Sequence, residues 1–250
     1  MPQRCDGRSL NMSQRHRNER RDNQIKKPGV VYIIRIHAQL LILAVAYFIA
    51  AGSLNIARAW IYFGIAAVTY FISSLILIKY NPGLISERAK ERGNTKSWDK
   101  VILSLYLLIG FLGTHIVAGL DSRFEWSSLD MIYMIPGALL YIVATIILIT
   151  SMLANKYFEA TARIQSDRGQ QVVKDGPYKI VRHPGYASVL LSFVAIPFMI
   201  GSLYALICTA AVFIIIITRT VLEDKMLQKE LTGYSQYAKE VKFRLIPGIW

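Results

Sequence analysis

Residues 131–153 read MIYMIPGALLYIVATIILITSML, an apolar run that contains no Asp, Glu, Lys or Arg. As an α-helix this run would extend about 35 Å, enough to cross the roughly 30 Å hydrocarbon layer of a bilayer. Comparable runs occur elsewhere in the chain, and hydrophobic residues make up 54% of it. The sequence therefore predicts an all-α, polytopic integral membrane protein, because a soluble domain of this length does not carry several such runs.

The apolar runs predict about six membrane helices. Four of the runs are long enough to span the membrane, and they cover residues 30–51, 60–78, 101–120 and 131–153. The last two, residues 187–200 and 203–218, are shorter and have only Gly201-Ser202 between them. A 14-residue helix reaches roughly 21 Å, so this pair predicts a tight helical hairpin that need not cross fully. Pro197 is expected to kink or end the first helix of the hairpin, because proline removes a backbone donor.

The formal net charge of +13 is distributed as membrane topology requires. All but three of the 29 Lys and Arg residues fall in residues 1–29, 79–100, 154–186 and 219–250. These segments alternate with pairs of apolar runs, which is the positive-inside pattern with both termini in the cytoplasm. The pattern favours a topological role for the charge, and no nucleic-acid partner is expected.

The chain divides into three parts. Residues 1–29 are polar and basic, and they predict a disordered cytoplasmic tail near anionic membrane lipids. Residues 30–153 form the four-helix membrane region, whose first run is too long for a signal-peptide core and is therefore a retained span. Residues 154–250 hold a loop, the hairpin and an amphipathic cytoplasmic segment. The two cysteines, Cys5 and Cys208, offer neither a disulfide framework nor a metal site.

Polar residues bracket the hairpin on both sides. Before it comes Arg182-His183-Pro184-Gly185-Tyr186, in which proline predicts a helix start whose free backbone donors favour an anion. Tyr186 adds an aromatic face, which suits a cation such as a sulfonium. After the hairpin, Arg219, Glu223 and Leu227 recur every fourth residue and so share one face of a continued helix. Because the two ends of a hairpin lie side by side, Glu223 is expected close to His183 and Tyr186.

Simpler interpretations stand beside the functional ones. Arg182 and His183 are also typical of residues that anchor a helix end to lipid phosphates. Arg219 and Glu223 are also typical of an ion pair within one helix. The loop between the second and third spans, with Asn81-Pro82-Gly83, Glu87-Arg88 and Trp98-Asp99, predicts a solvated connector, and a roof over the pocket on the cytoplasmic face is the alternative. The span histidines, His37 and His115, are expected to be hydrogen-bonded packing residues.

Three linked motifs resemble those of the isoprenylcysteine carboxyl methyltransferase family, integral membrane enzymes that are similar to the phospholipid N-methyltransferases. The motifs are Arg182-His183-Pro184-x-Tyr186, Arg219-Thr220-x-x-Glu223-Asp224-x-x-Leu227 and Gly233-Tyr234-x-x-Tyr237. The resemblance covers roughly residues 154–250. It implies that S-adenosyl-L-methionine binds in a cytoplasmic pocket, with a tunnel into the membrane for a lipophilic acceptor such as the carboxylate of a prenylcysteine.

The resemblance also implies roles for individual residues. Arg219 matches an arginine that lies near the reacting groups in such enzymes. The implied cofactor contacts, including wall and support positions, are Arg182, His183, Pro184, Gly185, Tyr186, Glu223, Leu227 and Tyr237. One departure is Asp224, which stands where glutamate is common and matters little if Glu223 makes the direct contact. No metal is required for methyl transfer, and no metal cluster is expected.

Two other classes of protein fit parts of the pattern. Membrane NADPH-dependent sterol reductases resemble this family, but their arginine-histidine-proline motif usually continues with Asn-Tyr and a glutamate, where this chain has Gly185 and Val189. A transporter would explain the spans but not the polar bracket, and it predicts charged or broken helices near mid-membrane. Methylation of a phospholipid amine or of a thiol remains an alternative within the methyltransferases.

Overall fold

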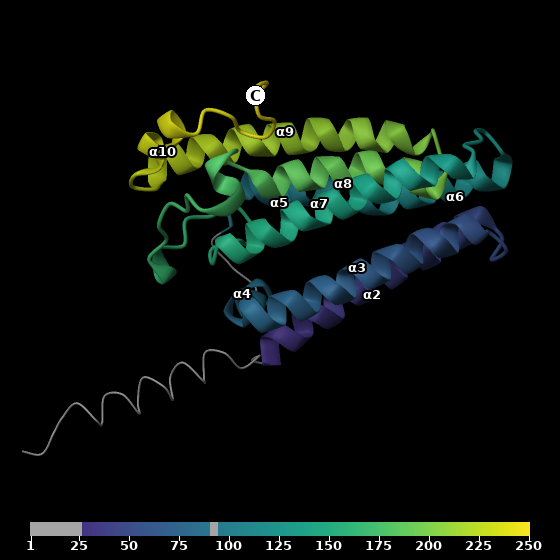
Figure 1. The fold of residues 1–250 in the computed structure, drawn as a ribbon, viewed down its shortest axis with the longest axis horizontal. Coiled ribbons are helices and arrows are strands. Elements are labelled where there is room, and N and C mark those ends of the chain that lie inside the picture. Colours follow the sequence, from purple (N-terminus) through teal and green to yellow (C-terminus); the bar gives the residue numbers. More distant parts are fainter. Residues whose placement is uncertain (1–26, 91–94) are drawn as a thin grey trace, which may run out of the picture.

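The computed structural model describes residues 27–90 and 95–250, and within these residues it contains helices and no strands (Figure 1). The α-helices are α2 (Lys27–Ala51), α3 (Ala57–Tyr80), α4 (Pro82–Arg88), α5 (Ser97–Leu105), α6 (Thr114–Phe124), α7 (Met134–Ala154), α8 (Pro184–Ile200), α9 (Ala205–Glu230) and α10 (Tyr234–Glu240). The π-helix η1 (Tyr106–Gly113) joins α5 to α6. The predicted all-α class is confirmed. Residues 1–26 of the predicted tail, with Cys5, lie outside the described residues.

Five segments are long and apolar enough to cross a membrane, which supports a multi-pass membrane protein. They are Gly29–Ala51, Ala57–Tyr80, Ser97–Phe124, Met131–Ala154 and Ala205–Glu230. The first four contain the four predicted spans. The fifth, α9, has 26 residues: it contains most of the predicted apolar run 203–218 and then continues as a helix through Arg219, Glu223 and Leu227, as the sequence predicts. It continues past Arg219 and Asp224 because both charges are buried beside charged partners, so they do not end the helix.

The short helix α8 accommodates its proline without ending there. Pro197 lies inside α8, which ends three residues later at Ile200, where Gly201 takes a left-handed conformation with φ of 88°. Proline cannot donate to the carbonyl four residues before it, that of Phe193. The hydroxyl of Thr209 in α9 donates to this carbonyl at 2.8 Å instead. A neighbouring helix thus satisfies the acceptor, as a lipid environment requires.

The helices pack in two layers, with α2 and α3 on one side and α7, α8 and α9 on the other (Figure 1). The main core lies between them and contains Tyr47, Tyr62, Ala195 and Met199. Glycine allows one close approach, since a Cβ on Gly119 of α6 would lie 2.5 Å from the carbonyl oxygen of Tyr47 in α2. Small residues of this kind let membrane helices pack tightly.

The end of the bundle where α8 finishes and α9 begins holds a polar cluster, which we call the distal cluster (Arg58, Asp121, Ser127 and Ser202). The buried carboxylate of Asp121 accepts hydrogen bonds from the hydroxyls of Ser127 at 2.6 Å and Ser202 at 2.5 Å, and from the backbone N–H of Ser127 at 2.7 Å. Arg58 donates to the carbonyl oxygens of Met199 and Phe198, which are among the last in α8. The distal cluster therefore closes the ends of helices.

Candidate active site

A pocket lies at the opposite end of the bundle, where α8 begins and α9 ends. It lies between the loop after α7, the start of α8, the last turns of α9 and α10. Polar and aromatic side chains line it, and we call it the polar pocket. The predicted site residues on its wall are Arg182, His183, Gly185, Tyr186, Glu223, Leu227 and Tyr237. The other two, Pro184 and Arg219, are buried beside the wall.

The structure brings Tyr186 and Glu223 together across the hairpin, as the sequence predicts. The hydroxyl of Tyr186 donates a hydrogen bond to Oε2 of Glu223. The ring of His183 stacks on that of Tyr186 with centroids 5.7 Å apart, and the guanidinium of Arg219 lies 5.2 Å from the Tyr186 centroid. Tyr186 therefore fixes the direction of a carboxylate that faces the pocket.

Asp224, the next residue after Glu223, points into the protein and is fully buried. Arg182 donates to it from Nε at 2.8 Å and Nη2 at 2.9 Å, which is a bidentate pair. The hydroxyl of Tyr234 lies 3.0 Å from Oδ1 and Nε2 of His183 lies 3.2 Å from it, while Arg244 donates to Oδ2 at 3.0 Å. The motif comparison predicts only a minor role for Asp224. In the structure this carboxylate joins α9 to the segment before α8, to α10 and to the C-terminal segment.

Burial and the Asp224 carboxylate determine the protonation states of Arg182 and Tyr234. Burial opposes the charge of Arg182, but the hydrogen bond and the negative charge of Asp224 raise its pKa above the ordinary value. Burial, and then the neighbouring Asp224 carboxylate, raise the pKa of Tyr234 well above its ordinary range. Arg182 therefore stays charged, and Tyr234 keeps the proton that it donates.

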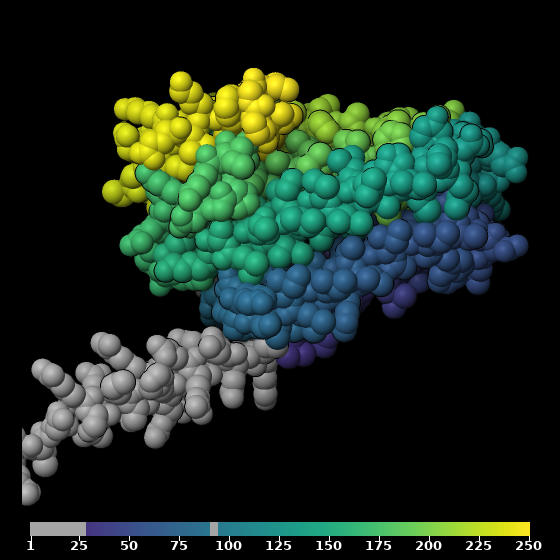
Figure 2. Space-filling view, viewed as in Figure 1, coloured from purple at the N-terminus to yellow at the C-terminus, as the bar shows by residue number. Residues whose placement is uncertain are grey.

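The C-terminal segment 241–244 holds the predicted motif in place. Nη1 of Arg182 donates to the carbonyl oxygens of Val241 at 2.8 Å and Lys242 at 2.9 Å. The backbone N–H groups of Arg182 and His183 donate to the carbonyls of Phe243 and Arg244. Figure 2 shows this C-terminal region, in yellow, packed against the green loop that precedes α8. Arg182 is thus occupied by protein partners, and any contact with a ligand would be additional to these.

Arg219 pairs with Asp99 rather than with Glu223. Its Nε and Nη2 donate to the two carboxylate oxygens of Asp99 at 2.8 and 3.1 Å, and Nη2 also donates to the carbonyl of Ala160 at 2.5 Å. Asp99 is fully buried in the first turn of α5. The prediction of a solvated connector is wrong for this residue, because a carboxylate with a buried arginine partner remains inside the protein.

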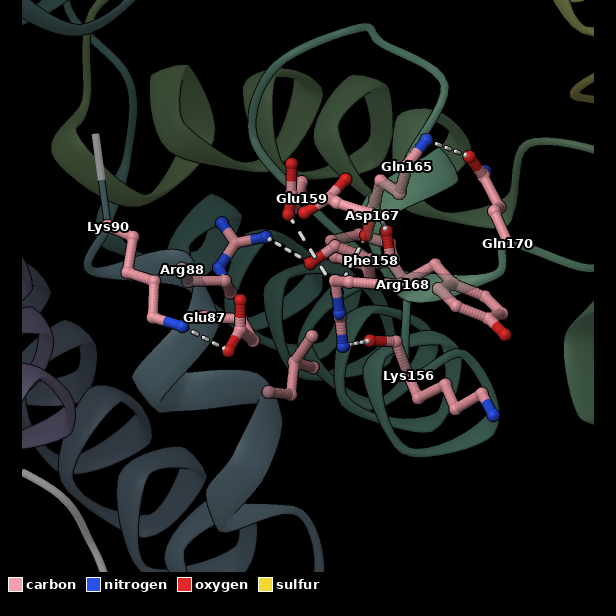
Figure 3. Close-up of polar contacts among 12 residues, drawn as sticks. Glu87, Arg88, Lys90, Lys156, Phe158, Glu159, Gln165, Asp167, Arg168 and Gln170 are labelled. Carbon is pink, nitrogen blue, oxygen red and sulfur yellow. Dashed lines mark hydrogen bonds and ion pairs between the residues drawn. The ribbon is translucent and has the colours of Figure 1, made fainter. Parts of the chain in front are cut away.

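The loop after α7 forms one wall of the polar pocket and is stiffened by its own polar contacts (Figure 3). The amide of Gln165 donates to the carbonyl of Tyr157 at 2.7 Å, and Arg168 donates to that of Lys156 at 2.6 Å. Arg88 at the end of α4 donates to the carbonyl of Phe158 at 3.1 Å. The N-terminal half of the chain therefore holds one wall of a pocket built mainly by the C-terminal half.

A second, larger cavity of about 240 Å³ lies among the membrane helices, and we call it the membrane cavity. Its lining residues come from α2, α3, η1, α6, α7 and α8 and include no Asp, Glu, Lys or Arg. His115, on its wall, has Nδ1 2.6 Å from the carbonyl of Phe111 and Nε2 2.9 Å from the hydroxyl of Tyr62. Since a carbonyl only accepts, Nδ1 carries the proton and Nε2 accepts from Tyr62. His37 also bonds to its own helix, at Ile33, so both histidines are hydrogen-bonded as predicted.

Comparison with known proteins gives one family match, in the second half of the chain. Residues 132–232 match the phospholipid methyltransferase family. This family of integral membrane methyltransferases is related to the isoprenylcysteine carboxyl methyltransferases, so the resemblance expected from the sequence is confirmed at this level. The match contains both polar motifs that bracket the hairpin, and it ends before Tyr237.

One protein is similar over a shorter stretch. The chain is 38% identical over 63 residues to the uncharacterized protein YpbQ of Bacillus subtilis (strain 168). The stretch covers 24% of this chain and 37% of the relative's length, so the chain spans well under two thirds of that relative.

Proposed function

We propose that this protein is an integral membrane methyltransferase that uses S-adenosyl-L-methionine and methylates a lipophilic acceptor. The observation that carries the proposal is the contrast between two adjacent carboxylates. Asp224 is neutralised by two arginines, whereas Glu223 lies on the pocket wall with the Tyr186 hydroxyl as its hydrogen-bond donor. A pocket that presents a carboxylate and aromatic faces fits a ligand with positive groups.

The residues of the polar pocket suit such a donor. When bound, S-adenosyl-L-methionine supplies an electrophilic methyl group on a positively charged sulfur. Glu223 would balance a positive charge, and Tyr186 would hold the carboxylate in one orientation. Arg182, on the wall, and Asp224, behind it, fix the start of α8 against α9 and so keep His183 in place. Catalysis then rests on placing the reactants and excluding water.

The acceptor is proposed to reach the site from the membrane cavity, whose uncharged lining suits an apolar tail. His183 Nε2 already lies within 3.3 Å of both Asp224 and Tyr234, so it is committed within the protein. An acceptor that needs no general base is therefore favoured, such as the carboxylate of a prenylcysteine-like molecule. A phospholipid amine is the second candidate, because the family match favours it.

The first test is calorimetric binding of S-adenosyl-L-methionine to the purified protein in detergent, with the Glu223→Gln variant alongside. We expect micromolar binding that is at least tenfold weaker in the variant, because the amide removes the negative charge. Glu230→Gln is the matched control, since Glu230 lies at the end of the same helix and pairs with Lys96 on the surface. Equal affinity in the Glu223 and Glu230 variants would overturn the site assignment.

A parallel titration with NADPH separates the proposal from the sterol-type reductases. Binding of NADPH alone would move the protein to that class. We also propose that residues 154–250 act as the donor-binding region and that the polar pocket and both termini face the cytoplasm, as the positive-inside pattern requires.

A further inference from the structure

The polar pocket and the membrane cavity approach each other along the first turn and a half of α8. Gly185 and Tyr186 line the polar pocket, whereas Ser188 and Val189 line the membrane cavity. Ser188 is buried, and its hydroxyl donates to the carbonyl of Gly185 at 2.7 Å. The two spaces are thus only about one helical turn apart.

Phe158 occupies the boundary between these spaces. A Cβ on Gly185 would lie 2.7 Å from Cε2 and Cζ of Phe158, so the absence of a side chain at Gly185 is what admits the ring. On one side Phe158 lines the polar pocket. On the other it packs against a cluster that includes Leu77 and Met152, and both of these line the membrane cavity.

Arg88 holds Phe158 from the side of α4. Its guanidinium carbon lies 5.4 Å from the centroid of the Phe158 ring, and Nη1 donates to the Phe158 carbonyl at 3.1 Å (Figure 3). The same guanidinium lies 5.3 Å from the ring of Tyr32, a residue of the membrane cavity, and Nε donates to the Tyr32 hydroxyl at 3.1 Å. One cation therefore links a residue of each cavity, with two cation–π contacts and two hydrogen bonds.

We propose that Phe158 is the partition between the two cavities: its ring, seated on Gly185 and held by Arg88, seals the membrane cavity from the polar pocket. The sealed arrangement keeps water out of the apolar space, and the polar end of an acceptor must displace the ring to reach the polar pocket. Phe158 is thus a positioning and selectivity residue. The seal is inferred from the two cavities alone, whereas its displacement by an acceptor rests on the proposed function.

Thiol labelling tests the partition without any assay of activity. Ser188→Cys places a thiol on the membrane-cavity side, in a protein whose Cys5 is replaced by serine. The probe is a charged, membrane-impermeant maleimide, and labelling of each cysteine is followed by peptide mass spectrometry. In the Ser188→Cys parent, which keeps Phe158, we expect slow labelling of the introduced thiol. Adding Phe158→Ala should make this labelling at least tenfold faster. Phe158→Tyr, which keeps the ring, should label as slowly as the parent.

A pair of glycine variants provides an independent arm. Gly185→Ala should also accelerate labelling because the added methyl group displaces the ring, whereas Gly64→Ala should not, since nothing lies within 4 Å of that position. The native, buried Cys208 reports any general loosening, and its labelling should stay slow throughout. Fast labelling in the parent, or unchanged labelling in both the Phe158→Ala and Gly185→Ala variants, would overturn the proposal. Labelling that accelerates equally at Cys208 would overturn it as well, because the effect would then be unfolding.

Discussion

The two ends of the helical bundle each bury a carboxylate, and they differ in what lies beside it. At the distal cluster, Asp121 accepts hydrogen bonds from two hydroxyls and one backbone N–H, all of them uncharged donors. At the other end, Asp224 carries the structural ion pairs and leaves Glu223 directed into open space. In our proposal, the carboxylate of Glu223, which remains after the structural ion pairs are formed, is what makes one polar cluster a binding site and leaves the distal cluster structural.

The largest effect is expected from removing the structural carboxylate. Asp224→Ala leaves the buried charge of Arg182 without its partner, and breaking a buried pair in this way costs about 3–5 kcal/mol. Unfolding in detergent should show this loss, together with exposure of the C-terminal region to protease. A variant as stable as the wild type would mean that Asp224 does not join the segments as described.

The distal carboxylate should matter less, which sharpens the contrast. Asp121→Asn disturbs hydrogen bonds from neutral donors only, for which a loss of about 1–3 kcal/mol is expected. The same unfolding measurement gives this value, and calorimetry should show unchanged binding of the methyl donor. Weakened donor binding in this variant would break the proposed separation between the two ends.

Tyr186→Phe tests the orientation of Glu223 without removing its charge. A hydrogen bond to a charged carboxylate is worth about 1.5–3 kcal/mol, so the affinity for S-adenosyl-L-methionine should be weaker by at most roughly 12- to 160-fold. Stability should change little, because the aromatic ring and its stacking on His183 remain. If affinity is unchanged while Glu223→Gln abolishes binding, the hydroxyl does not orient the carboxylate.

The smallest effect concerns a surface contact at the same end of the bundle. A hydrogen bond from Lys174 lowers the pKa of Glu240 below its ordinary value of 4.5. Stability from this pair is therefore present above the ordinary carboxyl pKa and is lost as the pH falls through the lowered folded-state value. Wild type and Glu240→Gln should differ slightly in melting temperature at pH 7 and should converge in acid. A gap that widens in acid would contradict this sign.

The parts of the fold that depend on local pattern were predictable from the sequence. Apolar length gave the spans, and the hairpin placed Tyr186 next to Glu223, which the structure confirms. The roles proposed for these residues in binding a methyl donor remain predictions. The four-residue spacing of Arg219, Glu223 and Leu227 predicts that the helix continues beyond the apolar run, and α9 does so.

The missed contacts have partners that are distant in sequence. Asp99 and Arg219 are 120 residues apart, and Arg182 and Asp224 are 42 apart. Neither periodicity nor spacing specifies such a pair, because the partner is chosen by tertiary packing. The adjacent acids Glu223 and Asp224 offered a signal, since neighbours on a helix point about 100° apart and so cannot both face one pocket.

The hydrogen bonds between Arg182 and segment 241–244 also impose an order on biosynthesis. The first of these carbonyl partners, that of Val241, lies 59 residues after Arg182. At roughly 5–20 residues per second, Arg182 waits about 3–12 seconds for it after leaving the ribosome's catalytic centre. Throughout that interval the membrane helices already made can pack, while the motif before α8 is incomplete. The polar pocket therefore cannot be complete before residues 241–244 are made, and a ribosome that stalls shortly before residue 241 leaves a chain without a finished site.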